Sequence, residues 1–172
     1  MFETIGDKDL REGLKWQTFC NLSAVYPWTE ALLTKFADKI IWREIVTNGQ
    51  IRWTLPMMER FKDRIPWEKL SRCTEPWTAF DPAIVRYFAD RWNWSSLSGN
   101  PNLRIETVEE FPDRLDWTQV INNSGLEEAF GVAFYLRFWE HIPLKELPLT
   151  LLWHVMAEEG QVEIEKMLNL KR

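Results

Sequence analysis

His154 and Glu158 are the pair of residues whose types and spacing come closest to a reactive site in this sequence. Four residues apart on a helix, they would lie on one face and could share a metal ion or a proton. Two ligands are too few for a metal site, however, and such pairs are frequent by chance. An enzyme with an unfamiliar site near His154 and Glu158 is therefore kept only as a competing hypothesis.

The other residues that could carry chemistry form no catalytic motif. The 7 glycines and 2 histidines contribute to no Gly-x-Gly-x-x-Gly motif, phosphate-binding loop, His-Glu-x-x-His motif or Gly-x-Ser-x-Gly motif. Cys20 and Cys73 form no Cys-x-x-Cys pair and are interpreted as buried free thiols. His141 lies at a predicted helix C-terminus, where the helix dipole favours a cation. We expect no catalytic residue, no metal and no other cofactor.

The composition indicates a folded chain that does not bind nucleic acid. Of its 172 residues 45% are hydrophobic, and 11 Trp and 10 Phe give ample material for a core. The net charge is −5 and the 21 basic residues are scattered, so no basic stripe could neutralise a phosphate backbone. The acidic start of the chain does not resemble a signal peptide, and the longest apolar segment, 147–157, is too short to cross a bilayer. We expect a cytoplasmic protein without membrane contact.

A pattern of about 25 residues recurs along the chain. It consists of Phe, an acid two residues later, a basic residue three later, a large apolar residue four later and Trp six later, and we name it the Phe block. Four Phe blocks follow the pattern, and a fifth has His for the basic residue and Leu for Trp: Phe36–Trp42, Phe61–Trp67, Phe88–Trp94, Phe111–Trp117 and Phe138–Leu144. With Trp16 as the first, the anchor tryptophans are 23 to 27 residues apart.

Each repeat is predicted to be a helical hairpin. A short helix begins at the anchor Trp, with an apolar residue three positions later, which is Phe19 in the first repeat. A longer helix begins at Thr29, Thr54 or Asp81 and ends at the Phe block. We expect four anchors to occupy equivalent, mostly buried places: Trp42, Trp67, Trp94 and Trp117.

The recurrent acids of the Phe blocks are predicted to cap the short helix that follows, because free backbone N–H groups at a helix start favour a carboxylate. These acids are Asp38, Asp63, Asp90, Asp113 and Glu140. Their basic neighbours are interpreted as ordinary solvated charges that agree with the helix dipole.

One hairpin is too small to be stable alone, so stacking of neighbours must create the core. We therefore expect an all-α fold, a short α-solenoid of about five hairpins of roughly 25 residues. The chain is predicted to be a single domain, 1–172, with an N-terminal cap at 1–13, Trp-rich repeats at 14–148 and a C-terminal helical cap at 149–172.

The short helices carry the motif Trp-x-x-Leu-Ser-x-Asn, which is complete at Trp94–Asn100. Over residues 14–148 the chain resembles Trp-rich tandem-repeat proteins of bacteria and giant viruses. Three repeats depart from the motif, with Val46 or Ile121 in place of Ser and Cys73 in place of Asn. The resemblance implies the repeat fold, and the family has no common assigned activity.

A binding surface is expected where the repeat is broken, because function is grafted onto a fold. The segment 126–142 is predicted to be one helix that is apolar on two nearly opposite sides. Phe130, Phe134, Phe138 and Ile142 form one stripe, and Val132, Tyr135, Leu136 and Trp139 form the other. Packing of the second stripe against a C-terminal hairpin at 149–170 is the simpler interpretation, and a partner or dimer surface is the functional alternative.

Two further departures lie in the third and fourth repeats. A longer loop in the third repeat makes Arg72, Glu75 and Phe80 candidates for partner contacts. Pro112 should shorten or kink the helix of its Phe block.

The sequence as a whole predicts a non-enzymatic protein–protein interaction module with a protein partner. A specific form is an inhibitor or immunity-type protein that occludes a toxin, in line with the small size, acidic charge and lack of chemistry. The alternative is a self-associating structural protein, a homodimer that uses Tyr135 and Trp139. The candidate partner-binding residues are Val132, Tyr135, Leu136, Trp139, Arg72, Glu75 and Phe80.

Overall fold

The computed structural model describes residues 7–75 and 77–167, and within these ranges it contains helices and no strand. The predicted all-α class is confirmed. The chain divides into two compact units, the first ending at Ala79 and the second beginning at Phe80. In both units, short helices that begin with Trp alternate with longer ones.

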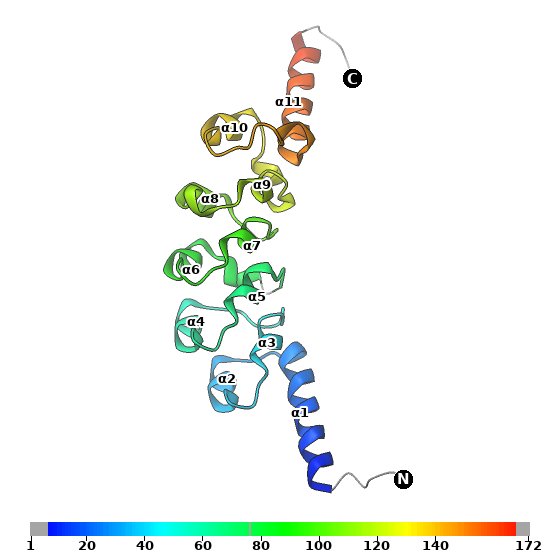
Figure 1. Ribbon diagram of the computed structural model, residues 1–172, viewed down its shortest axis with the longest axis vertical. Coiled ribbons are helices and arrows are strands. Elements are labelled where there is room, and N and C mark those ends of the chain that lie inside the picture. Colours follow the sequence, from blue (N-terminus) through cyan, green and yellow to red (C-terminus); the bar gives the residue numbers. More distant parts are fainter. Residues whose placement is uncertain (1–6, 76, 168–172) are drawn as a thin grey trace, which may run out of the picture. The chain divides into compact units, whose positions relative to one another are not determined.

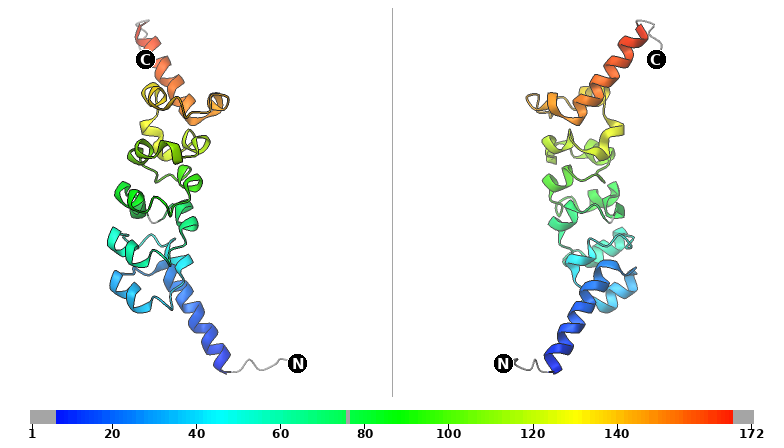
Figure 2. Two further views of the ribbon diagram at one scale, coloured as in Figure 1. Left: turned by 60° about the vertical axis from the view of Figure 1, so that its left-hand side comes forward. Right: turned by 90° about the vertical axis from the view of Figure 1, so that its right-hand side faces the viewer.

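The first unit begins with a long helix and continues with alternating longer and short helices. These are α1 (Asp7–Val25), α2 (Glu30–Phe36), α3 (Trp42–Ile45), α4 (Leu55–Phe61) and α5 (Trp67–Arg72). Within this unit, α2 and α4 lie next to each other, and α3 packs against the end of α1 (Figure 1). Both views of Figure 2 show that α1 continues well beyond α2 as a straight helix.

The second unit repeats this alternation. It contains α6 (Pro82–Tyr87), α7 (Trp94–Ser98), α8 (Ile105–Glu110), α9 (Trp117–Val120), α10 (Val132–Phe138) and α11 (Leu151–Met167). Short 3-10 helices lie at Trp77–Phe80, which reaches from the first unit into the second, and at Pro112–Arg114, Ser124–Ala129 and Leu147–Leu149. The longer helices α6 and α8 pack against each other, and so do the short helices α7 and α9 (Figure 1).

The predicted helix starts are confirmed. The side chains of Thr29, Thr54 and Asp81 accept hydrogen bonds from backbone N–H groups of the first turns of α2, α4 and α6. Asn93 and Asp116 do the same for α7 and α9. Helix α8 ends at Glu110 and a 3-10 turn follows from Pro112, as the proline predicts.

The four anchor tryptophans occupy equivalent places, as predicted. Each indole N–H donates a hydrogen bond to the carbonyl oxygen five residues earlier, at 2.8 to 3.0 Å. These residues are Trp42, Trp67, Trp94 and Trp117, of which Trp67 and Trp117 are buried and the other two half-buried. Most of these rings also contact a Phe block further along the chain: Trp42 packs on Phe61, Trp94 on Phe111 and Trp117 on Phe138, with ring centroids 5.0 to 5.2 Å apart.

The assignment of Trp16 as the first anchor is wrong. Trp16 lies inside α1, which runs without a break from Asp7 to Val25, and 61% of its surface is exposed. Phe19 takes the anchor place instead. Its ring packs on Phe36 with centroids 6.2 Å apart, and Ser23 follows it at the spacing that separates Trp94 from Ser98.

The prediction of one helix over 126–142 is also wrong. A 3-10 helix ends at Ala129, Gly131 has a positive φ of 148°, and α10 begins at Val132. A residue with a side chain is strained at such a φ, so glycine makes this break possible. The stripe formed by Phe130, Phe134, Phe138 and Ile142 is buried as predicted.

The C-terminal segment forms one helix, α11, where a hairpin was predicted, because a single uninterrupted helical run continues to Met167. Of its side chains only Leu152 is fully buried among the described residues. Residues 1–6 of the predicted N-terminal cap and 168–172 of the C-terminal cap lie outside the described residues.

Candidate functional site

Buried asparagines join consecutive repeats. The Asn48 amide donates hydrogen bonds to two carbonyl oxygens of the preceding repeat, at 2.9 and 2.8 Å. The Asn123 amide donates in the same way to Ser98 and Asn100, at 2.8 and 2.9 Å. In both cases the amide oxygen accepts a hydrogen bond from the backbone N–H two residues later. These side chains are therefore satisfied within the scaffold and fix the register between repeats.

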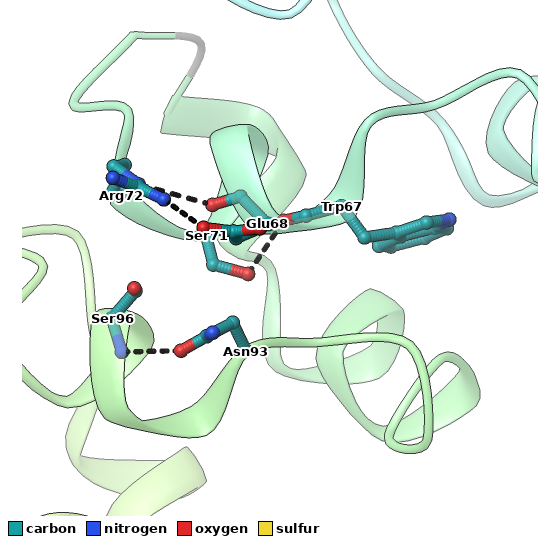
Figure 3. A network of polar contacts seen from close by, with 6 residues as sticks. All are labelled: Trp67, Glu68, Ser71, Arg72, Asn93 and Ser96. Carbon is teal, nitrogen blue, oxygen red and sulfur yellow. Dashed lines mark hydrogen bonds and ion pairs between the residues drawn. The ribbon is translucent and has the colours of Figure 1, made fainter.

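Serines four residues after the anchor form a second link. Ser98 donates its hydroxyl proton to the Trp94 carbonyl at 2.7 Å and accepts a hydrogen bond from the Asp116 N–H at 2.9 Å. Ser23 accepts from the Ile41 N–H in the same way, at 2.9 Å. Figure 3 shows Ser71 of α5, which donates to the Trp67 carbonyl at 2.8 Å, and the Asn93 side chain, which caps α7 by accepting from the Ser96 N–H.

The departures from the motif at this position now have a physical reason. Ser23 and Ser98 accept from the residue just before the next anchor, and where Val46 replaces the serine, that position is held by Pro66, which has no N–H to donate. Ile121 and Pro143 make the second such pair, in the other unit. The hydroxyl and the N–H are thus present together or absent together in these pairs, so neither substitution leaves a buried donor unpaired.

Asp38 and Asp90 bind arginines of the next repeat and are not the residues that cap the following helices. Arg64 donates to the Asp38 carboxylate at 2.6 Å and to the Ala37 carbonyl at 2.9 Å. Arg114 repeats this arrangement on Asp90 and the Ala89 carbonyl, at 3.0 and 2.8 Å. Arg64 and Arg114 therefore link consecutive repeats, and their interpretation as ordinary solvated charges is wrong.

The partners of Asp38 and Asp90 lie far from them in the sequence. The Asp38 and Asp90 side chains are largely exposed, and a guanidinium 24 to 26 residues away in the sequence reaches them. Capping is done by other groups or not at all: Asn93 and Asp116 cap α7 and α9, and α3 has no side-chain cap.

Side chains at fixed positions of the longer helices also contact the next repeat. Arg60 of α4 pairs with Glu30 of α2 at 3.2 Å and donates to Thr34 at 3.3 Å, and these residues precede Phe36 by six and two positions. Arg137 of α10 pairs with Glu109, two positions before Phe111. These positions, together with the acid and the carbonyl that an arginine of the next repeat binds, form the face of a repeat that contacts the next one, which we name the forward face. It consists of the positions six and two before the block Phe and one and two after it.

In the last repeat all four positions of the forward face are exposed, and three of them are apolar. Its positions are held by Val132, Leu136, Trp139 and Glu140, where the first block has Glu30, Thr34, Ala37 and Asp38. Leu136 is 64% exposed and Trp139 is 53% exposed. We name Val132, Leu136 and Trp139 the α10 patch. Large apolar side chains are normally exposed singly, so this group marks a candidate interaction surface.

The C-terminal helix covers only the beginning of α10. Glu159 of α11 accepts a hydrogen bond from the Val132 N–H at 2.9 Å, and a Cβ added at Gly131 would lie 2.8 Å from the same carboxylate. Leu136 and Trp139 are exposed, so the described part of the C-terminal segment, up to Met167, does not cover these two residues of the second stripe. Tyr135, the remaining residue of the second stripe, is half-buried and therefore less exposed than Leu136 and Trp139.

The candidates in the third repeat are not brought together. Arg72 is paired with Glu68 and lines a cavity of about 590 Å³ with Arg43, Pro66, Trp67, Glu68 and Lys69. Glu75 is exposed beside Gly49. Phe80 is 1% exposed and packs on Trp92, so the prediction that it contacts a partner is wrong. Its aromatic side chain is part of the core, although it follows a long loop.

A second apolar surface, which the sequence interpretation missed, lies in the first unit. Six side chains of α1, α2 and the turn between them line a groove of about 210 Å³, which we name the α2 groove: Phe19, Leu22, Tyr26, Trp28, Leu32 and Phe36. Leu22 is 37% exposed. Its register with Leu97, 75 residues later, was a signal that could have located it, because Leu97 is completely buried.

The chemistry suggested for His154 remains an isolated pair. Its Nε2 lies 3.4 Å from a Glu158 carboxylate oxygen, and both side chains are mostly exposed on α11. Among residues 7–75 and 77–167, no group of three or more His, Cys, Asp or Glu side chains could hold a metal ion. In the same ranges, no helix is long and apolar enough to cross a membrane.

Comparison of the chain with protein families, with curated proteins and with solved structures gives no match.

Proposed function

We propose that this protein is a non-enzymatic protein-binding module, built as a short α-solenoid, whose binding surface is the α10 patch. The observation that carries the proposal is the change of character at the forward face. Two positions before the block Phe, Thr34 and Glu109 contact the next repeat through polar side chains, whereas the last repeat has the exposed Leu136 there. One position after the block Phe, the last repeat has the exposed Trp139. The repeat motif also supports a place among the Trp-rich tandem-repeat proteins.

The patch has the composition of an interaction hot spot. Trp is enriched among residues that dominate binding energy, and a neighbouring Leu supplies further apolar surface that water leaves on binding. Arg137 on α10 and Glu140 just after it are exposed charged residues next to the patch in the sequence. An apolar centre with a polar rim is the usual arrangement of a protein interface.

An inhibitor or immunity-type protein that occludes a toxin is a specific form of this proposal. Net charge supports it, since a chain with a charge of −5 would be steered toward a basic partner. Such a partner would have to cover Leu136 and Trp139.

The experiment is capture of partners from the native cell lysate with the wild-type chain, the Trp139→Ser variant and the Tyr87→Ser variant. Tyr87 is a matched control, because it is an exposed aromatic residue outside the patch. We expect Tyr87→Ser to retain the partners of the wild type and Trp139→Ser to lose them, with circular dichroism unchanged for both. Equal capture by all three proteins would contradict the proposal.

A further inference from the structure

We propose that the α10 patch binds the α2 groove of a second copy of this chain, so that the copies associate head to tail. The inference rests on the proposed function and names the partner. It requires that the first repeat exposes the same face that, in an inner repeat, packs against the preceding repeat. The structure allows this to be tested residue by residue, because residues 19–48 and 94–123 correspond at a constant offset of 75.

Two residues of the α2 groove, Leu22 and Leu32, are more open than their buried counterparts in the second unit. At the offset of 75, Leu22 corresponds to Leu97 and Leu32 to Thr107. Leu97 and Thr107 are buried, and α6, the longer helix of the repeat before α8, packs against α8. Leu22 is 37% exposed and Leu32 is half-buried, because no longer helix precedes α2 among the described residues. At these two positions the groove is open where the second unit is covered.

The α10 patch supplies the matching surface. It is the forward face of the last longer helix, the face with which α2 meets α4 and α8 meets α10. A second copy placed there would continue an interface that the chain already forms within each unit. Leu136 and Trp139 would then enter a groove lined by apolar and aromatic side chains.

The charges of the two surfaces are complementary in the same register. In the inner repeats, the basic residue of a Phe block reaches back to the acid of the block before it, as Arg64 does to Asp38. Lys39 is the basic residue of the first block, and no Phe block precedes it in the sequence. Glu140 is the exposed acid of the last block, and no Phe follows it. Head-to-tail association pairs Lys39 of one copy with Glu140 of the other.

The long terminal helices supply further area. A stable interface buries roughly 1,200 Å² or more, which two short helices cannot provide. Both α1 and α11 expose large apolar side chains, namely Leu14 and Trp16 on the first and Trp153 and Ile164 on the second. Between Tyr26 and Val132, by contrast, Tyr87 is the one exposed large apolar side chain among those described. Because the two surfaces differ, the contact is heterologous and association continues beyond a dimer, to a ring or an open row.

The test is sedimentation velocity of the full chain over a range of concentrations up to about 0.5 mM, a range in which a weak complex would still be detected. We expect the mean mass of the wild type to rise with concentration. Lys39→Glu and Glu140→Lys should each weaken association at least tenfold. An equimolar mixture of the two variants should restore it, because each reversed charge then meets its opposite.

Glu128→Lys is the matched control for Glu140→Lys, because Glu128 is also exposed and lies outside the patch; it should leave association unchanged. A chain that stays monomeric, or a mixture that does not associate, would overturn the inference. Capture of a different protein that depends on Trp139, by a monomeric chain, overturns self-association and leaves the proposed function standing. Absence of any binding that depends on Trp139, including self-association, overturns both.

Discussion

Asn123 follows Ser98 by 25 residues, and its amide nitrogen donates a hydrogen bond to the Ser98 carbonyl oxygen at 2.8 Å. The same relationship holds between Asn48 and Ser23, at 2.9 Å. Each bond spans one repeat and is buried. A single side chain at the end of one short helix thus satisfies the carbonyl groups that end the short helix before it.

Replacing Asn123 by Ala should destabilise the protein by roughly 2 to 3 kcal/mol, because two carbonyl oxygens and one N–H lose their partner in a buried place. The free energy of unfolding in urea measures the effect. Asn21→Ala is the control, since Asn21 is exposed on α1, and it should change stability by less than about 0.5 kcal/mol. Similar losses for the two variants would show that the repeat bond is not what stabilises the junction.

The pairing of Val46 with Pro66 predicts an energetic coupling between them. Pro66→Ala introduces an N–H without a partner, and Val46→Thr introduces a hydroxyl that could accept its hydrogen bond, as Ser98 does from Asp116. We expect each single variant to be less stable than the wild type. The double variant should lose about 1 kcal/mol less than the sum of the two. Additive effects in the double-mutant cycle would refute the explanation.

The register of the first repeat predicts unequal effects at Phe19 and Trp16. Phe19→Ala removes the ring that packs on Phe36 and should cost roughly 2 kcal/mol. Trp16→Ala removes an exposed side chain and should cost less than about 0.5 kcal/mol in the monomer at low concentration. Thermal unfolding distinguishes the two, and a larger loss for Trp16→Ala would restore the original assignment.

The contacts of Arg114 predict that its carbonyl bond matters more than its ion pair. The guanidinium bonds to the Ala89 carbonyl and lies 5.5 Å from the centre of the Trp94 ring, whereas Asp90 is largely exposed. Arg114→Ala should cost about 1 kcal/mol, and Asp90→Ala less than about 0.5 kcal/mol. If high salt removed the whole difference between wild type and Arg114→Ala, the ion pair would be the stronger contact.

Burial raises the pKa of the Cys73 thiol, against the nearby charges of Lys69 and Arg72, which lower it. In a Cys20→Ser variant, the rate of alkylation by iodoacetamide should therefore rise with a midpoint above about 8.5, the ordinary value. The same variant in denaturant provides the reference. Because the folded state holds the thiol proton more tightly, the free energy of unfolding should fall as the pH rises past that value. A lower midpoint in the folded protein would contradict the assignment.

The sequence was sufficient for features that depend on neighbouring residues. The helix starts at Thr29, Thr54 and Asp81 follow from side chains that bond to N–H groups two or three residues away. The equivalence of the anchor tryptophans follows from a bond that spans five residues within a block of constant length. The buried stripe beginning at Phe130 follows from helical spacing, even though the helix itself is broken at Gly131.

The register of the first repeat was accessible in principle. Ser23 follows Phe19 as Ser98 follows Trp94, and the distance from Phe19 to Trp42 equals that from Trp94 to Trp117. A pattern defined by Trp does not include Phe19, because Phe fills the same place with a smaller ring.

By itself the sequence determined the all-helical class, the helix starts at Thr29, Thr54 and Asp81 and the period of the repeat, which follow from local bonds and from residue spacing. The tertiary structure decided what each repeat presents to the next. Whether Asp38 caps a helix or binds Arg64, and whether Leu136 and Trp139 are covered, depends on side chains about one repeat away in the chain. Those contacts form only when hairpins stack, because the residues that meet are then set by packing between helices and not by spacing within one.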